Sequence, residues 1–85
     1  MRHARADYSR IQDPAGLIPE DEPVFLLRAQ DYCALKTLST WIEEAQRVGV
    51  DRHMIQSAID QHERFTSWRL QHGVKSPDMP LEKAQ

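Results

Sequence analysis

Residues 31–49 read DYCALKTLSTWIEEAQRVG, and the apolar positions in this stretch recur at the spacing of one face of an α-helix. The apolar residues are Ala34, Leu35, Leu38, Trp41, Ile42, Ala45 and Val48. Asp31 is a suitable N-cap, and Gly49 stands where a helix commonly ends in the left-handed conformation. The pattern predicts an amphipathic helix over residues 31–48.

A second amphipathic stretch follows after a short connection. Its apolar face consists of Met54, Ile55, Ala58, Ile59, His62, Phe65 and either Trp68 or Arg69. Asp51 is expected to cap this helix, and Gly73 follows its end. We therefore predict a second helix over residues 51–72 and, because the connection is short, an antiparallel helical hairpin.

The polar residues of both helices indicate structural roles. His62 lies on the apolar face of its helix, where a histidine is more often hydrogen-bonded in the structure than used as a ligand or an acid–base group. Two pairs of opposite charge stand at i,i+4 spacing and are expected to stabilise the helices: Glu43 with Arg47 and Asp60 with Arg64.

The chain is expected to divide into an N-terminal arm (1–22), a helical domain (23–73) and a flexible tail (74–85). Within the arm, residues 13–16 read DPAG and predict a turn. Residues 23–30 read PVFLLRAQ and admit two interpretations. A short helix that begins behind a proline is favoured, and an edge strand built from the four apolar residues is the alternative.

Two helices cannot bury both of their apolar stripes against each other, because each stripe is wide and includes a tryptophan. We therefore expect an all-α fold completed by self-association, most simply an isologous homodimer with a core like that of a four-helix bundle. Aromatic and aliphatic side chains are the expected contacts of this interface or of a partner. These candidate interface residues are Phe25, Leu27, Trp41, Phe65 and Trp68.

The composition excludes several classes of function. The 85 residues carry a net charge of -2, and no basic tract favours nucleic acid or a membrane surface. No apolar run reaches the roughly 20 residues of a membrane span, and the first residues lack the apolar core of a signal peptide, so we expect a cytoplasmic protein with no membrane partner. The single cysteine, Cys33, excludes an internal disulfide.

The sequence shows no catalytic motif. A phosphate-binding loop, an HExxH pair and a nucleophile elbow are all missing, and the four histidines do not have the spacing of metal ligands. We therefore expect a protein that is not an enzyme and that has no catalytic, cofactor-binding or metal-binding residues.

Residues 45–58, AQRVGVDRHMIQSA, resemble a helix-turn-helix motif, with alanine in the first helix and glycine at the turn. In this alternative the chain is a small DNA-binding regulator. The side chains expected to contact bases are then Arg52, His53, Gln56 and Ser57.

Residues 13–31 read DPAGLIPEDEPVFLLRAQD. This segment resembles a group of small phage and prophage proteins of unknown function, in which a proline-rich start and the DEPVFLLR stretch precede two helices. The resemblance implies a phage-encoded accessory protein in the host cytoplasm. Such a protein would bind a host or phage protein without catalysis, for example to inhibit a host-defence complex such as a CRISPR effector. No site residue follows from the resemblance.

Overall fold

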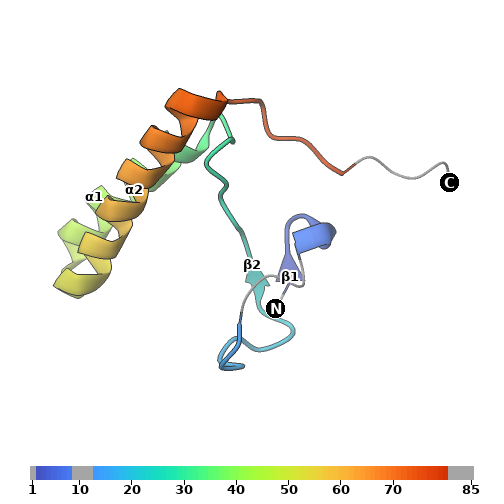
Figure 1. The fold of residues 1–85 in the computed structure, drawn as a ribbon. Coiled ribbons are helices and arrows are strands. Elements are labelled where there is room, and N and C mark those ends of the chain that lie inside the picture. Colours follow the sequence, from blue (N-terminus) through green and yellow to red (C-terminus); the bar gives the residue numbers. More distant parts are fainter. Residues whose placement is uncertain (1, 9–12, 81–85) are drawn as a thin grey trace, which may run out of the picture. The chain divides into compact units, whose positions relative to one another are not determined.

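The computed structural model describes residues 2–8 and 13–80, and Figure 1 shows their fold. Two compact units divide the chain: residues 1–26 with 78–85, and residues 27–77. The elements along the chain are β1 (Arg2–His3), a 3-10 turn η1 (Ala6–Tyr8), β2 (Pro23–Val24), α1 (Ala34–Val48) and α2 (Arg52–His72). The described part of the chain is therefore mostly helical and contains one minimal pair of strands.

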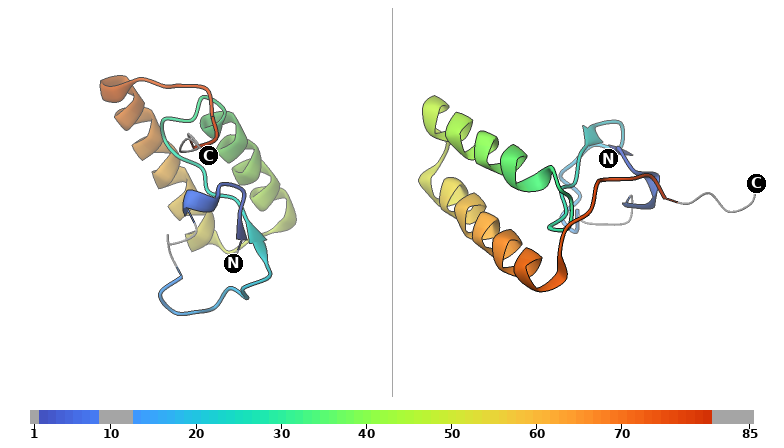
Figure 2. Two further views of the ribbon diagram at one scale, coloured as in Figure 1. Left: turned by 90° about the vertical axis from the view of Figure 1, so that its right-hand side faces the viewer. Right: turned by 90° about the horizontal axis from the view of Figure 1, so that it is seen from above.

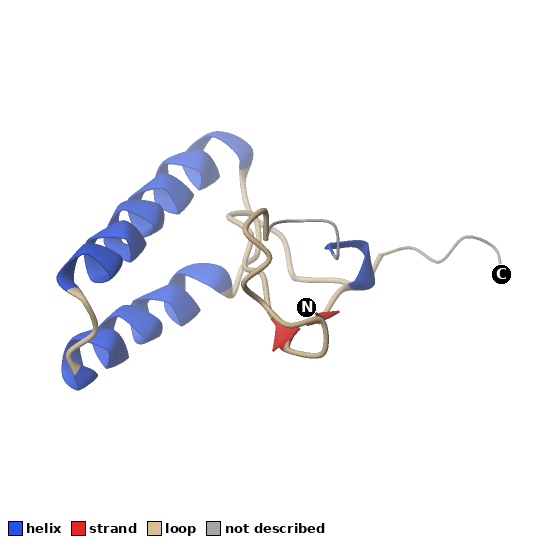
Figure 3. Ribbon diagram, turned by 90° about the horizontal axis from the view of Figure 1, so that it is seen from below, coloured by secondary structure: helices blue, strands red, loops and turns tan. Residues whose placement is uncertain are grey.

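The unit of residues 27–77 contains the predicted antiparallel helical hairpin, which Figures 2 and 3 show from further directions. Only residues 49–51 separate the two helices, so α2 returns along α1. The buried side chains of the described residues all lie between these helices: Ala34, Ala45, Ala58 and Phe65, at most 8% exposed. Alanines at the contact allow the helices to approach closely, and one phenyl ring fills the space that remains.

The turn of the hairpin forms as the sequence predicts. Gly49 adopts a left-handed conformation with φ of 82°, and its N–H donates to the carbonyl of Ala45 at 3.1 Å. Asp51 caps α2, because its carboxylate accepts from the backbone N–H groups of His53 at 2.8 Å and Met54 at 3.3 Å. A helix end and a helix start therefore fit into three residues.

The start of α1 differs from the prediction, because the helix begins at Ala34 and not at residue 31. Cys33 occupies the N-cap position without a side-chain cap. Asp31 instead accepts the N–H of Cys33 at 2.7 Å and stabilises the turn that precedes the helix. The expectation that Asp31 caps α1 was wrong, since its hydrogen bond satisfies a group outside the helix.

The open end of the hairpin is closed by a parallel β-bridge between Asp31 and Lys75. The N–H of Tyr32 donates to the carbonyl of Lys75, and the N–H of Lys75 donates to the carbonyl of Gln30, both at 2.8 Å. Lys75 belongs to the segment expected to form a flexible tail. Its backbone is paired, which ties the chain after α2 to the chain before α1.

The other unit contains the parallel pair of β1 and β2, with Arg2 opposite Pro23 and His3 opposite Val24. The N–H of Ala4 extends this ladder by donating to the carbonyl of Val24 at 3.2 Å. The helix favoured for residues 23–30 was therefore wrong, and the alternative strand is present over two residues. The reason is that the backbone of Val24 is engaged by β1, while Pro23 fits an edge strand because it has no N–H to donate.

Arg5 makes polar contacts that stabilise this unit outside the strand pair. Arg5 donates to both carboxylate oxygens of Asp7, at 2.9 and 2.8 Å, and to the carboxylate of Asp78 at 3.2 Å. Its guanidinium also lies 4.8 Å from the centre of the Tyr8 ring. The hydrogen bond with Asp7 and the nearby negative charges raise the pKa of Arg5.

The predicted turn at residues 13–16 is confirmed. The N–H of Gly16 donates to the carbonyl of Asp13 at 3.0 Å, and Gly16 has φ of 64°. The Asp13 carboxylate also accepts from the N–H groups of Leu17 at 2.9 Å and Ile18 at 2.8 Å. One side chain therefore organises the backbone of six residues.

Candidate interaction surface

Four large apolar side chains lie on one side of the hairpin. Trp41 and Val48 are seven residues apart on α1, and Met54 and Trp68 are fourteen apart on α2, so each pair forms a stripe along its helix. We call these four residues the tryptophan side.

Helical geometry places the two stripes next to each other. Ala45 and Ala58 are buried, so they mark the direction in which each helix faces the other. At 100° per residue, the stripe on each helix is rotated away from this direction by about 40° to 80°, and the rotation has the same sense on both helices. In an antiparallel pair, rotations of equal sense lie on the same side of the hairpin. The tryptophan side is therefore one surface built from both helices.

This surface is open to solvent. Val48 is 57% exposed, Met54 50%, Trp41 42% and Trp68 38%. The opposite side of the hairpin carries four half-buried aliphatic residues, Leu35, Ile42, Ile55 and Ile59, and one exposed leucine, Leu70. Four of the five exposed large apolar side chains of α1 and α2, including both tryptophans, thus gather on a single side, which is typical of a binding surface.

The indole of Trp68 is held in place by its own helix. It stacks on the ring of His72, with centroids 4.2 Å apart and planes 15° apart, and Nδ1 of His72 lies 2.9 Å from the Trp68 carbonyl oxygen. An aromatic group that is fixed before binding loses less conformational entropy when a partner covers it. Trp68 is therefore the best-prepared anchor of the surface.

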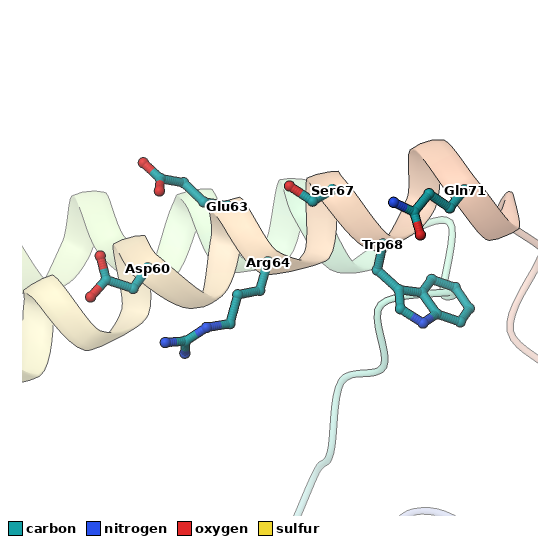
Figure 4. Close-up of a pocket in the computed structure, with 6 residues that line it drawn as sticks. All are labelled: Asp60, Glu63, Arg64, Ser67, Trp68 and Gln71. Carbon is teal, nitrogen blue, oxygen red and sulfur yellow. The ribbon is translucent and has the colours of Figure 1, made fainter.

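Trp68 also borders a shallow hollow of about 480 Å³ on the outward face of α2 (Figure 4). Its lining is Asp60, Glu63, Arg64, Ser67, Trp68 and Gln71. Two of its polar groups already bond along the helix, because Asp60 accepts from Gln56 at 2.9 Å and Arg64 donates to Gln61 at 3.1 Å. The hollow adds a mixed-charge rim to the edge of the tryptophan side.

His62 is hydrogen-bonded, as the sequence predicts. Its Nε2 lies 3.0 Å from the hydroxyl oxygen of Ser39, so the pair links α2 to α1 on the side opposite the tryptophans. This contact supports the packing of the helices and gives His62 a structural role.

The five predicted interface residues occupy four different environments. Trp41 and Trp68 are exposed on the tryptophan side, whereas Phe65 is 8% exposed and fills the core of the hairpin. Leu27 is half-buried in the same unit, and Phe25, 72% exposed, belongs to the other unit. The ring of Phe65 is engaged in the core, so it does not contribute to the surface.

Val48 and Met54 belong to this surface although the sequence analysis did not select them as interface residues. Both were recognised as apolar helix positions. The signal that separates them from the core is their rotation away from Ala45 and Ala58, which requires knowing which residues face the other helix.

The predicted i,i+4 ion pairs do not form. Arg47 bonds both carboxylate oxygens of Glu44 instead of Glu43, and this contact lowers the pKa of Glu44 and raises that of Arg47. Asp60 and Arg64 bond glutamines and not each other. The partners found instead stand three or four residues away, and both spacings lie equally close on a helix surface, so spacing alone does not select the partner.

The residues of the DNA-binding alternative lie together at the start of α2. They are Arg52, His53, Gln56 and Ser57, and all four are exposed. The negative charge of Asp51 lies beside them, with its Oδ1 3.6 Å from Nδ1 of His53.

Within the part of the chain that the structure describes, no group of three or more histidine, cysteine, aspartate or glutamate side chains is placed to hold a metal ion. None of the helices in residues 2–8 and 13–80 has the length and apolar character needed to cross a lipid bilayer.

Comparison with protein-family models, with curated proteins and with solved structures gives no match for this chain. Its function is therefore inferred from its own residues and their geometry.

Proposed function

We propose that this chain is a non-catalytic helical interaction protein that self-associates and binds another protein through the tryptophan side of its hairpin. The observation that carries the proposal is the exposure of Trp41, Val48, Met54 and Trp68 on one side of a hairpin that has only a thin core. From the resemblance that residues 13–31 show to small phage and prophage proteins, we further propose that the chain is phage-encoded and that its partner is a host or phage protein, a host-defence complex being one class.

The chemistry of the surface supports this function. Tryptophan is among the residues that contribute most to binding at protein interfaces, because it buries a large rigid area at a low cost in conformational entropy. The hollow at Arg64 and Glu63 offers a polar rim beside the indole of Trp68. An apolar centre with a polar edge is the usual arrangement of such an interface.

The test is capture of partners from the bacterial host on the tagged chain, with identification by mass spectrometry and measurement of affinity for the purified partner. Trp68→Ala is expected to weaken binding by about 30-fold or more, since truncation of an anchoring tryptophan costs about 2 kcal/mol or more. The matched control is Leu70→Ala, because Leu70 is apolar and 84% exposed but lies on the other side of α2.

The control decides between a specific surface and general stickiness. Leu70→Ala and the polar change Gln56→Ala are expected to leave the affinity within about twofold of the unchanged chain. Equal losses for Trp68→Ala and Leu70→Ala would contradict the proposal that the tryptophan side is the binding surface.

A second candidate function is DNA binding through the start of α2, favoured by the exposure of Arg52, His53, Gln56 and Ser57 together behind a three-residue turn. Against it, α2 is 21 residues long, and Asp51 and Asp60 flank the proposed contacts with negative charge. Fluorescence anisotropy with mixed duplex DNA at low salt tests it. Binding that weakens steeply as salt rises and is lost in Arg52→Ala supports the regulator, and no binding at low salt excludes it.

A further inference from the structure

The outer edge of β2 carries backbone groups with no partner. In the parallel ladder, Val24 turns its N–H and C=O toward β1, because its carbonyl accepts from Ala4 at 3.2 Å and it stands opposite His3. β2 ends at Val24. Peptide groups alternate in direction along a strand, so when β2 is continued by one residue, the N–H and C=O of Phe25 point to the opposite edge. No hydrogen bond to the backbone of residues 25–27 occurs among the described residues.

This edge is accessible and apolar. Phe25 is 72% exposed, and Glu22 and Pro23 on one side of it and Arg28 on the other are exposed as well. An unpaired apolar edge of this kind is a template for another strand. The remaining question is which strand the edge accepts.

The segment is complementary to itself in one antiparallel register. With Phe25 opposite Phe25 of a second copy, Val24 stands opposite Leu26, and Pro23 opposite Leu27. Glu22 then stands opposite Arg28, and two-fold symmetry forms this pair of opposite charges twice. Apolar residues meet apolar residues at every position between the two charge pairs.

The hydrogen bonds fit the same register. Residues directly opposite each other in a narrow antiparallel pair exchange both N–H···O bonds, and Phe25 takes the outward orientation that this requires when β2 is extended through residues 25–27. The next outward groups are the carbonyl of Pro23 and the N–H of Leu27, which form a further bond on each side. Because Pro23 has no N–H, the carbonyl of the opposite Leu27 bonds to water instead. No other group loses a partner, so the proline is compatible with the pairing.

We propose that the outer edge of β2 pairs with the same edge of a second copy of this chain, antiparallel and centred on Phe25. This inference rests on the self-association in the proposed function and assigns that contact to residues 22–28, which leaves the tryptophan side free for a different protein. Arg28 contributes although its guanidinium also donates to Gln30, at 3.0 and 3.3 Å, when the side-chain amide of Gln30 is turned so that its oxygen faces Arg28. A guanidinium has five N–H donors, so it can serve both partners.

The first experiment measures the mass of the full chain by light scattering over a range of micromolar concentrations. A reversible dimer is expected for the unchanged chain. Phe25→Pro removes the two central N–H donors and the phenyl pair while retaining an extended backbone, and is expected to raise the dissociation constant about 100-fold. Phe25→Val keeps the N–H and a residue suited to strands, and is expected to raise it by no more than about tenfold.

The second experiment tests the register through charge. Glu22→Arg places two arginines in each facing pair of a homodimer, and Arg28→Glu places two glutamates there, so each variant alone is expected to dimerise about tenfold more weakly. When the two variants are mixed, every facing pair again has opposite charges. Native mass spectrometry of the mixture is therefore expected to show mainly the mixed dimer.

The outcomes separate the two proposals. A chain that remains monomeric at all concentrations overturns the self-association in the proposed function and this pairing with it. A dimer that ignores Phe25→Pro but dissociates on Trp68→Ala overturns the strand pairing alone. A dimer sensitive to Phe25→Pro with no preference for the mixed species overturns the register centred on Phe25, and unchanged helical circular dichroism in each variant shows that the hairpin has remained folded.

Discussion

The hairpin and the unit of residues 1–26 with 78–85, which we call the N-terminal unit, are stabilised by different kinds of interaction. The hairpin contains every buried side chain of the described residues, and its apolar positions repeat over two helices. The N-terminal unit has no buried side chain among its described residues and depends on individual polar contacts made by Arg5 and Asp13. The hairpin should therefore respond strongly to the loss of apolar volume, and the N-terminal unit to the loss of particular charges.

This difference bears on function as well. The buried core of the hairpin consists of only three alanines and one phenylalanine, yet two tryptophans, a methionine and a valine are exposed on one side of it. The N-terminal unit exposes Phe25 directly after β2. Each unit thus presents an apolar surface of its own kind, a helical side in one and a backbone edge in the other.

The largest expected effect is the loss of the one large core side chain. Phe65→Ala should lower the free energy of unfolding by about 3 kcal/mol, because it removes the phenyl ring and leaves a cavity between α1 and α2. For a domain of this size that is a large part of the total stability. The measurement is urea denaturation followed by circular dichroism at a helical wavelength.

The matched control for this change is Leu70→Ala, in a residue that is 84% exposed on the same helix. It should alter the free energy of unfolding by no more than about 0.5 kcal/mol. If the two variants were equally stable, the helices could not be held together by the packing of Phe65.

A smaller effect is expected at the turn of the hairpin. Asp51→Ala removes the acceptor of the His53 and Met54 N–H groups and should lower the free energy of unfolding by about 1 kcal/mol. Asp51→Asn keeps a good N-cap and should cost only a few tenths of a kcal/mol. The same urea titration measures both, and a loss of equal size in both variants would show that the charge of Asp51 matters more than its hydrogen bonds.

The sequence predicted the hairpin well because its signals are local and redundant. Helical spacing identified α1 and α2, while Gly49 and Asp51 marked the turn between them. The bonding of His62 also followed from its place on an apolar face, although its partner Ser39 did not. A repeated pattern tolerates an error of a few residues, such as the start of α1 at Ala34.

Contacts between distant segments could not be predicted in the same way. Pro23 and Val24 form a strand because they pair with β1, which lies some twenty residues earlier in the chain. Nothing in PVFLLRAQ identifies that partner. The bridge from Asp31 to Lys75 is likewise set by where α2 ends. The tryptophan side can be recognised only when it is known which residues of each helix face the other helix. From the sequence, Val48 and Met54 could therefore be recognised as apolar but not as part of a common surface.

The smallest expected effect is local and depends on pH. The backbone N–H groups of Ile18 and Leu17 bond the Asp13 carboxylate and lower its pKa below the ordinary value. Because the pKa is lower in the folded chain than in the unfolded one, these bonds stabilise the loop above the ordinary pKa of about 4 and are lost as the pH falls through the lower folded value. Amide chemical shifts of Leu17 and Ile18, followed by NMR from neutral pH downward, should therefore titrate together below about pH 4.

Asp13→Asn is the matched variant for this titration, since the amide oxygen can still accept a hydrogen bond but carries no charge that titrates. The shared titration of the Leu17 and Ile18 amides should disappear in this variant, while the free energy of unfolding of the hairpin stays within about 0.5 kcal/mol of that of the unchanged chain. Persistence of the same titration would mean that another carboxylate governs the loop. A loss of hairpin stability would mean that the hairpin is not stabilised independently of the N-terminal unit, because the charge of Asp13 would then contribute to the stability of the hairpin.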